Sequence, residues 1–317
     1  MQMDGNDGNV RHQPWAVSRF LNLEEAISMS LIHRPAALYH PYQPTFDKLL
    51  NTYTQYKTAV LDIFNNGVQF EGFYIDSKHI DRTFVLPDGC VNLVICCHPQ
   101  YPSANICGNL FKGRQGIFVR AECEYFVVRF LPGYAEHFFK HPIGEFSELE
   151  VPIQEVLPHA DELLERVAEQ TSLEGRVRAF EHFFLKYIGD ELEIPLLVKY
   201  LTEKIIAGSG TSNVKQLSED TGYSSRYLSK NFEKYVGLSP KLFSRIIRFQ
   251  NVIHLLEKQQ YEQALPQIFE LGYFDQNHFI KEFKEFSMLT PKKFIQQLAA
   301  GSLSVNTSQR VTDRASL

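Results

Sequence analysis

Long apolar runs and targeting signals are missing from this sequence. Among its 317 residues the longest strongly apolar run, Val91 to Cys97, is interrupted by Asn92 and is far too short to span a bilayer. The first 15 residues have no apolar core, which excludes a signal peptide. We therefore expect a cytosolic protein with no membrane partner, in a compartment where thiols stay reduced.

Catalytic signatures are missing as well. The sequence holds no Walker loop, no G-x-S-x-G and no H-E-x-x-H motif. Its acid-rich stretch, Glu145 to Glu155, is more typical of a solvated surface than of a catalytic pair. These absences predict a protein that is not an enzyme, has no catalytic residues and needs no cofactor.

Cysteine is sparse, and all five residues fall within 34 positions: Cys90, Cys96, Cys97, Cys107 and Cys123. None of them has the close C-x₂-C spacing of a zinc knuckle. On a strand, Cys96 and Cys97 would point to opposite faces of the sheet. The pattern therefore predicts small buried hydrophobic residues rather than a metal site, with a redox sensor as the alternative.

An excess of positive charge is missing too, because the net charge is −5. Residues 191–297 hold 14 Lys and Arg against 12 Asp and Glu, whereas residues 1–190 hold 16 against 24. A nucleic-acid reader in the C-terminal part would be only mildly basic. We therefore expect modest non-specific affinity for DNA.

A repeated motif is the most informative feature that is present. Gly222 and Gly272 lie 50 residues apart, and a helical pattern precedes each of them. After each glycine come an aromatic position, polar residues, a helical stretch with Lys, Phe and Lys, and a Ser/Thr-Pro step. A helix, a tight turn through Gly and a second helix with an exposed polar face form a helix-turn-helix, whose second helix can enter a DNA major groove.

The repeated motif resembles a known DNA-binding domain. The residues that carry the resemblance are Leu217 to Gly222, Tyr227 to Lys230, Phe232 and Gly237 to Pro240 in the first unit, and Gly272 to Phe279, Lys281, Phe283, Lys284, Thr290, Pro291 and Phe294 in the second. Residues 191–297 are thereby similar to the DNA-binding domain of AraC/XylS-family transcription regulators. The resemblance implies a sequence-specific regulator that binds double-stranded DNA, with a homodimer, and RNA polymerase if it is an activator, as further partners.

A second, shorter resemblance concerns the N-terminal half. The segments Leu86 to Cys90 and Arg129 to Gly133 resemble the sensor half of one subset of AraC-like regulators. This implies a small β-rich domain, for which a cupin-like fold is one candidate. Such a domain either binds a small-molecule effector, which the motif does not identify, or mediates dimerisation.

The fold class that these patterns predict is α+β. The expected parts are a polar N-terminal extension plus helix over 1–57, a β-rich sensor domain with C-terminal helices over 58–190, the DNA-binding domain over 191–297 and a disordered tail over 298–317. Helical spacing from Phe46 predicts a helix as far as Phe64. The expected strands are Val68 to Tyr74, Val91 to Cys97, Ile117 to Val119 and Tyr125 to Leu131. A linker helix of about 18 residues begins at Pro240 and joins the two helix-turn-helix units.

The outer face of the second helix in each unit carries the predicted DNA contacts. By their spacing, Tyr227, Leu228 and Phe232 in the first unit, and Phe279 and Phe283 in the second, point to the core. The residues predicted to contact base edges are Arg226, Ser229, Lys230, Gln276, Asn277, Ile280 and Lys281. The residues predicted to contact phosphates are Ser224, Ser225, Lys234, His278 and Lys284. The alternative is that all of these are ordinary solvated helix residues.

The first helix of the second unit departs from the repeat. Ile268 stands four residues before Gly272, where small Ser218 stands before Gly222. Pro266 falls near the predicted start of this helix, which looks one residue short. The departure leaves open an alternative function, a ligand-binding or protein-interaction module whose second DNA reader is degenerate.

Overall fold

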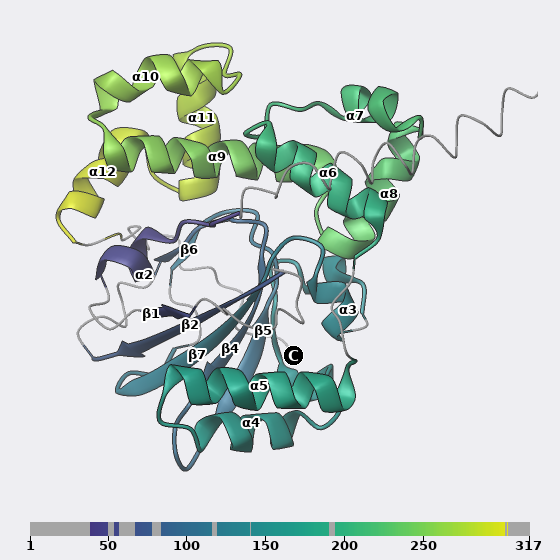
Figure 1. Cartoon of the computed structure of the whole chain (residues 1–317). Helices are drawn as coiled ribbons and strands as arrows, with labels where there is room; N and C mark the ends of the chain where they lie inside the picture. The colour runs from purple at the N-terminus through teal and green to yellow at the C-terminus, as the bar shows by residue number, and fades with distance from the viewer. Residues whose placement is uncertain are drawn as a thin grey trace, which may run out of the picture. The chain divides into compact units, whose positions relative to one another are not determined.

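A six-stranded antiparallel sheet is the scaffold of the N-terminal half in the computed structural model of the chain (Figure 1). Its strand order is β1-β2-β7-β4-β5-β8, and every neighbouring pair is antiparallel. The strands are β1 (Thr54–Tyr56), β2 (Val68–Ile75), β4 (Val91–Cys96), β5 (Ser103–Cys107), β7 (Cys123–Phe130) and β8 (Glu150–Pro152). Three of the four expected strands thus form, with shifts of one or two residues at their ends.

The structure describes residues 39–49, 54–56, 67–77, 84–115, 119–139, 141–189, 194–301 and 303, and these belong to one compact unit. Much of the N-terminal part expected over 1–57 and most of the expected tail lie outside them. So do Ile117 and Phe118 of the strand expected from Ile117 to Val119, while Val119 is not in a strand. None of the described helices combines the length and apolar character that crossing a bilayer requires.

Two helices cover one face of the sheet. They are α4 (Ala160–Ala168) and α5 (Leu173–Tyr187), the helices expected at the C-terminal end of the β-rich domain (Figure 1). Their inner residues, including Leu163 and Phe180, pack on Phe70, Leu93 and Phe126 of the strands in one buried cluster. The turn through Gly133 and the short helix α3 (Ala135–Phe139) close the end of this core.

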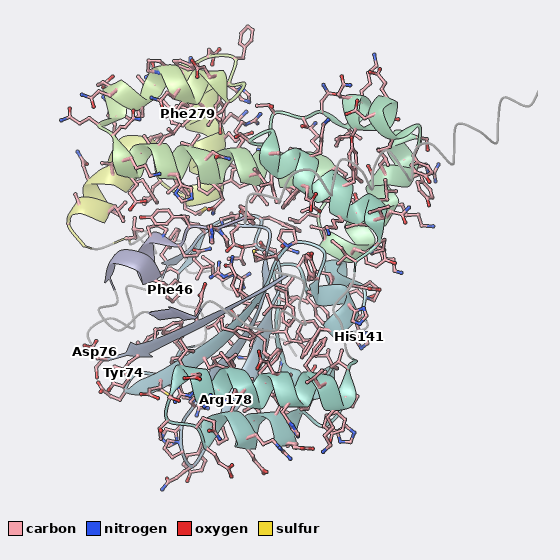
Figure 2. The ribbon with its side chains drawn as sticks, in the orientation of Figure 1. Phe46, Tyr74, Asp76, His141, Arg178 and Phe279 are labelled. Atoms are coloured by element: carbon pink, nitrogen blue, oxygen red, sulfur yellow. The ribbon has the colours of Figure 1, made fainter. Side chains whose placement is uncertain are left out.

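The opposite face of the sheet is covered by helix α2 (Pro44–Leu49) and by a small sheet of β3 (Phe84–Val85) and β6 (Arg114–Gln115). Phe46 of α2, labelled in Figure 2, packs on Phe73 with 5.0 Å between the ring centroids. The predicted helix from Phe46 to Phe64 is wrong at Thr54–Tyr56, which form a strand, while residues 50–53 and 57–64 lie outside the described residues. The chain instead enters β1, where Thr54 pairs with Gly72, because pairing with the edge of β2 satisfies backbone groups that a local helix would leave open on that strand.

Seven helices form the described C-terminal half, as the repeated motif predicts. They are α6 (Leu196–Ala207), α7 (Val214–Thr221), α8 (Ser225–Val236), α9 (Pro240–Lys258), α10 (Tyr261–Glu270), α11 (Gln276–Ser287) and α12 (Pro291–Ala299). Helix α9 has 19 residues and is therefore about 28 Å long. It joins the unit α7–α8 to the unit α10–α11.

The core of the helical half includes residues from outside it. Tyr42, Phe84 and Leu86, from the segments around α2 and β3, belong to the same buried cluster as Phe243 of α9 and Phe279 of α11. Leu303 is also fully buried in this cluster. Ordered structure therefore continues past residue 297, where the tail was expected to begin.

Candidate nucleic-acid interface and ligand pocket

The first helix-turn-helix unit is formed by α7 and α8. Helix α7 is capped by Asn213, whose side chain accepts a hydrogen bond from the Gln216 amide. It ends at Gly222, which has a φ of +71°, a left-handed conformation that suits glycine at a tight turn. The Ser224 hydroxyl then caps α8 by accepting from the Tyr227 amide. Ser224 is therefore the cap, and exposed Ser225 is the first helical residue.

The outer face of α8 presents most of the predicted base-contacting residues. Arg226 and Lys230 are exposed and Ser229 is half-buried, while Leu228 and Phe232 are fully buried as expected. Arg226 and Lys230 lie four residues apart, so they follow one another along the same face of the helix.

Tyr227 is not a core residue, contrary to the prediction. Its side chain is 47% exposed, and its ring stacks on Tyr223 with 4.9 Å between the centroids. The reason is helical geometry: Leu228 points inward, and Tyr227, the residue before it, is turned about 100° away from it. Tyr227 therefore adds an aromatic ring to the outer surface of the first unit.

Lys234, predicted to contact phosphate, is directed to the N-terminal half instead. Its ammonium lies 3.6 Å from the Glu136 carboxylate of α3 and 4.5 Å from the centre of the Tyr235 ring. A hydrogen bond with the Tyr235 hydroxyl, and then the nearby Glu136 charge, raise the pKa of Lys234. Lys234 keeps its positive charge, but in this arrangement it links α8 to α3.

The second unit is formed by α10 and α11, and its turn is one residue longer. The cap Ser224 follows Gly222 by two positions, whereas the cap Asp275 follows Gly272 by three. The additional residue is Phe274, whose side chain is 91% exposed. Counted from the caps, the two recognition helices are therefore equivalent with an offset of 51 residues rather than 50.

The offset of 51 brings the outward residues of the two recognition helices into correspondence. Arg226 corresponds to Asn277, Ser229 to Ile280 and Lys230 to Lys281. The remaining positions fit the prediction as well: Gln276, Asn277, His278, Lys281 and Lys284 are exposed, Ile280 is half-buried, and Phe279 and Phe283 are fully buried. The second unit therefore presents a polar face of the same kind as the first.

Helix α10 is not short, contrary to the interpretation of the sequence. It begins at Tyr261, so Pro266 lies in its interior, where it removes one backbone hydrogen bond of the helix. The residues turned inward are Ala264 and Ile268, both fully buried, while Phe269 is 37% exposed. Ile268 therefore fills the core of the second unit at the position of half-buried Ser218 in the first.

A cluster of ion pairs fastens the second recognition helix to the linker helix. The Glu282 carboxylate of α11 is 2.8 Å from Arg245 Nε and 2.8 Å from Arg248 Nη2, and only 4% of its side chain is exposed. Burial alone would raise the pKa of Glu282, but the two guanidinium groups outweigh it and lower the pKa. Arg245 also pairs with the exposed Glu285 at 2.7 Å.

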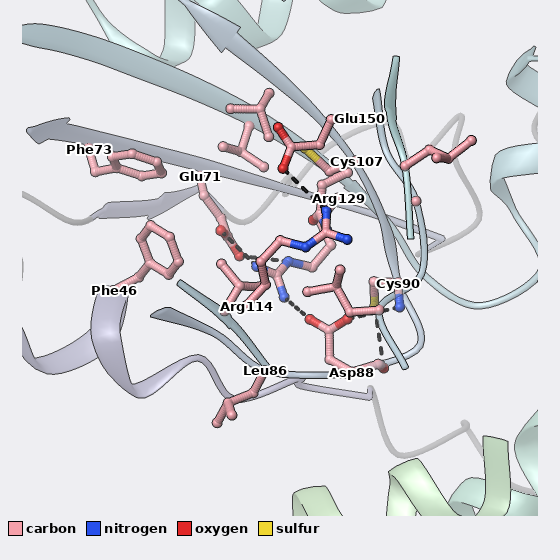
Figure 3. A pocket seen from close by; sticks show the side chains of 17 residues that line it. Phe46, Glu71, Phe73, Leu86, Asp88, Cys90, Cys107, Arg114, Arg129 and Glu150 are labelled. Carbon is pink, nitrogen blue, oxygen red and sulfur yellow. Dashed lines mark hydrogen bonds and ion pairs between the residues drawn. The ribbon is translucent and has the colours of Figure 1, made fainter. Parts of the chain in front are cut away.

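A cavity lies on the face of the sheet opposite α4 and α5 (Figure 3). The space between its lining atoms, including its open mouth, is about 640 Å³. Its lining residues come from α2, the strands and the β3–β6 sheet: Phe46, Glu71, Phe73, Val85, Leu86, Asp88, Cys90, Asn92, Val94, Cys107, Gly108, Leu110, Arg114, Val127, Arg129, Leu149 and Glu150.

Four of the lining residues form one row across neighbouring strands. The sheet register aligns Arg129 with Asn92, Asn92 with Cys107, and Cys107 with Glu150. Because paired residues lie side by side on the same face of a sheet, the row forms a polar strip along the cavity. The strip ends at Glu150, whose carboxylate lies 3.5 Å from Nη1 of Arg114.

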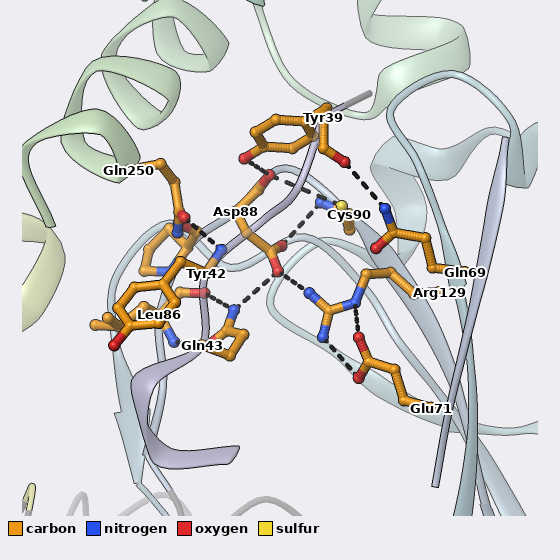
Figure 4. Close-up of polar contacts among 11 residues, drawn as sticks. Tyr39, Tyr42, Gln43, Gln69, Glu71, Leu86, Asp88, Cys90, Arg129 and Gln250 are labelled. Atoms are coloured by element: carbon orange, nitrogen blue, oxygen red, sulfur yellow. Dashed lines mark hydrogen bonds and ion pairs between the residues drawn. The ribbon is translucent and has the colours of Figure 1, made fainter. Parts of the chain in front are cut away.

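A buried ion triad forms one wall of the cavity (Figure 4). Arg129 lies between Glu71, at 3.1 Å, and Asp88, at 2.7 Å, and all three residues are at most 5% exposed. The Asp88 carboxylate also accepts hydrogen bonds from the Gln43 side chain at 2.8 Å and from the Cys90 amide at 3.0 Å. These contacts offset the cost of burying Asp88 and hold its loop against Arg129.

The same loop contacts the linker helix of the DNA reader. Gln250 of α9 donates a hydrogen bond to the Pro87 carbonyl at 2.8 Å and accepts one from the Tyr42 amide at 2.8 Å (Figure 4). Pro87 immediately precedes Asp88 of the triad. The wall of the cavity and helix α9 are therefore connected through two consecutive residues.

The cysteines behave as buried hydrophobic residues. All are free thiols, and Cys96 and Cys97 lie in the hydrophobic clusters on opposite faces of the sheet, as expected. Burial raises the pKa of Cys97 and of Cys123 to about 12, which leaves both thiols protonated and unreactive near neutral pH. Within the described ranges, no group of three His, Cys, Asp or Glu is arranged to hold a metal ion.

Sequence reasoning found the cavity only in part. The resemblance to a sensor half pointed to the segments that contain Asp88, Cys90 and Arg129. It gave no signal for Glu71 or Asn92, which read as ordinary polar residues of two strands. The signal that could have found them is a charged residue within a strand of alternating apolar and polar residues. A carboxylate buried in a sheet requires a partner on another strand.

Comparisons with known proteins match segments in both halves of the chain. Residues 217–297 match the family model of a helix-turn-helix domain, and residues 71–152 match a domain of unknown function. An uncharacterized HTH-type transcriptional regulator of Haemophilus influenzae is 32% identical over 82 residues, which span 26% of this chain and 27% of that protein. The chain therefore matches about a quarter of that relative's length.

Two crystal structures of ToxT from Vibrio cholerae align with this chain at low similarity. The alignment with the first spans 73% of this chain and 98% of that protein, with 11% identity and a TM-score of 0.36. The second is ToxT bound to an unsaturated fatty acid. Its alignment spans 79% of this chain and 97% of that protein, with 11% identity and a TM-score of 0.35.

The paired units, their capped recognition helices and the family match define this chain as a helix-turn-helix protein. Its C-terminal domain is of the AraC type and carries DNA-binding helix-turn-helix units. The N-terminal half joined to it is β-rich, in agreement with the predicted fold class.

Proposed function

We propose that the chain is a cytoplasmic transcription regulator that binds a specific duplex DNA sequence with α8 and α11 and alters this binding when a small effector occupies the cavity. The observation that carries the proposal is the pair of recognition helices with equivalent, exposed polar faces. They are joined by a linker helix of about 28 Å, close to the roughly 34 Å of one DNA turn.

The division of roles among the outward residues follows from their chemistry. Arg226, Lys230 and Lys281 can donate to guanine edges, and Gln276 and Asn277 suit adenine. Ser229 can donate to either kind of base, and Ile280 can contact a thymine methyl. His278, Lys284 and the helix N-termini at Ser224 and Ser225 suit phosphates.

Selection of binding sequences from a random duplex pool, followed by anisotropy titrations of the full chain, tests DNA recognition. Arg226→Ala should cost about 1–3 kcal/mol of binding and relax the preference at particular base pairs. Lys284→Ala should weaken all sequences alike and reduce the salt dependence. Lys215→Ala, an exposed lysine on α7, is the matched control. Absence of any selected sequence would support the alternative, an interaction module.

The cavity supports effector control because its wall continues into the linker helix. An effector that moves Asp88 also moves Pro87, whose carbonyl receives the Gln250 side chain of α9. Replacing Gln250 with Leu removes this bond and the bond from Tyr42 while it keeps the approximate size. If this route operates, Gln250→Leu should bind DNA but lose the response to cavity ligands.

A further inference from the structure

We infer that the cavity binds a small organic cation, an amine or amidine attached to an apolar or aromatic body. This inference rests on the proposed function of the cavity as the sensor site, and it adds the chemical class of the ligand. It is carried by the charge balance of the lining, by its hydrogen-bond acceptors and by its aromatic wall.

The charge balance of the lining is negative. Its charged residues are two arginines and three acids: Arg114, Arg129, Glu71, Asp88 and Glu150. Both guanidinium groups already face carboxylates, since Arg129 lies between Glu71 and Asp88 and Arg114 faces Glu150. One negative charge is left in excess, and a buried charge of this kind is stable only with a counter-charge.

The thiols and the phenol near the triad do not alter this balance. Burial, and next the charge of Glu150, raise the pKa of Cys107; burial, and next the charge of Asp88, raise that of Cys90. Burial also raises the pKa of Tyr39, whose hydroxyl donates to the Asp88 carbonyl. All three groups are therefore neutral near pH 7, so the excess charge belongs to the carboxylates.

Three of the polar lining residues offer acceptors to a ligand. Asn92 lies in the cross-strand row between Arg129 and Cys107, and its amide oxygen is buried without a hydrogen-bond partner among the described residues. Glu71 and Glu150 add carboxylate oxygens to the lining. A ligand that satisfies this set must donate N–H groups, which ammonium and amidinium groups do.

The apolar side of the cavity suits the rest of such a ligand. The rings of Phe46 and Phe73 lie 5.0 Å apart between centroids, at an angle of 43°, and Val85, Leu86 and Val94 continue the apolar surface. Aromatic faces attract cations and also pack well against an apolar body.

An anionic ligand fits poorly for the same reasons. To reach Arg129 it would have to displace Glu71 or Asp88 and leave that carboxylate buried without its partner. Asp88 is further held by Gln43 and by the Cys90 amide, so its displacement would break three contacts.

A matched set of three probes tests the inference on the full chain without DNA. Isothermal titration and ligand-observed NMR are carried out with 2-phenylethylammonium, 2-phenylethanol and phenylacetate, which share an aromatic body and differ in charge. We expect the ammonium compound to bind about tenfold more tightly than the alcohol, and phenylacetate to bind most weakly. Phenylacetate binding as tightly as the ammonium compound, or no binding by any probe, overturns the inference.

Variants of single carboxylates test whether the ammonium compound binds in the cavity or at carboxylates elsewhere on the protein. Glu71→Gln and Glu150→Gln should each lower the affinity for the ammonium compound by about tenfold and leave the alcohol nearly unchanged. Glu124→Gln is the control, because Glu124 is on strand β7 but pairs with Arg176 outside the cavity lining. Thermal melts show whether each variant is folded. If a variant is unfolded, the order of the three probe affinities on the wild-type protein still tests the inference. Unchanged ammonium affinity in both folded cavity variants contradicts the inference, whereas failure to bind DNA affects only the proposed function.

Discussion

The two helix-turn-helix units share one design but are held in place differently. In the first, the end of α8 is fastened to the N-terminal half: Asn109 donates to the Val236 carbonyl at 2.7 Å, and Ser147 donates to the Gly237 carbonyl at 3.3 Å. In the second, α11 is fastened to the linker helix by buried Glu282, although the Gly113 amide also donates to the Phe286 carbonyl. The first unit is therefore held partly by the N-terminal half, while the second carries its own anchor on the linker helix.

Breaking the anchor of the second unit should have the largest effect. Glu282→Ala leaves Arg245 and Arg248 without their buried partner, and we expect a loss of about 3–5 kcal/mol in the free energy of unfolding. Chemical denaturation measures it. Glu285→Ala, which removes a pair with an exposed carboxylate, should cost about 0–1 kcal/mol. Equal losses in the two variants would show that burial of Glu282 is not what matters.

The same anchor predicts a dependence on pH. The folded-state pKa of Glu282 is lowered, so its contribution is complete above the unfolded pKa of about 4.3 and is lost as the pH falls. The wild type should therefore lose more stability than Glu282→Gln when the pH falls from about 6 to about 3. Parallel curves for the two proteins would contradict the assignment.

The next prediction concerns Ile268, which lies in the core of the second helix-turn-helix unit. Ile268 is fully buried, so Ile268→Ala should open a cavity and cost about 2–5 kcal/mol. A thermal melt compares it with Phe269→Ala, a neighbouring truncation of a half-exposed ring. A raised melting midpoint for Ile268→Ala would mean that this side chain strains the unit instead of stabilising it.

A matched pair of lysines compares the two readers on DNA. Lys230 and Lys281 occupy the same position counted from their helix caps, and both are exposed. Replacing either by Ala should cost about 1–3 kcal/mol of specific binding, measured by anisotropy on the selected duplex. A loss confined to Lys230→Ala would identify the second unit as degenerate.

The contact that holds the first unit should give the smallest effect. Asn109→Ala removes the donor to the Val236 carbonyl and should lower the free energy of unfolding by about 0.5–1.5 kcal/mol. Ser147→Ala, which removes the longer bond to Gly237, should cost less. The informative readout is DNA affinity with and without a cavity ligand, because a loosened α8 should respond less. An unchanged response would place the coupling elsewhere, with Gln250 as the next residue to replace.

The readers were predictable from sequence because their signals are local. Glycines that stop helices, polar caps and apolar residues at helical spacing all act within a few residues of one another. Tyr227 was misplaced because it directly precedes buried Leu228, and consecutive helical residues point about 100° apart. The extra residue Phe274 lies between Gly272 and the cap of α11, so the 50-residue spacing of the glycines did not reveal the 51-residue offset between the recognition helices.

The cavity could not be predicted because its parts are distant in sequence. Glu71, Asp88 and Arg129 meet only after β2 pairs with β7 and the loop before β4 folds over them. The error at Thr54–Tyr56 has the same origin, since a pattern of aromatic residues compatible with a helix forms a strand there by pairing with β2. Long-range pairing is the information that a single sequence does not display.

The core shared by the two halves sets a limit on modular engineering of this protein. Tyr42, Phe84 and Leu86 are packed among the reader's own side chains, and a Cβ at Gly89 would lie only 2.7 Å from the Phe243 ring. A chimera cut near residue 191 would expose this apolar surface and would leave the Val236 carbonyl without its donor. A fusion of the C-terminal helices to another N-terminal domain would therefore have to include segments 39–46 and 84–90. These segments complete the core of the helical half although they precede it in the sequence.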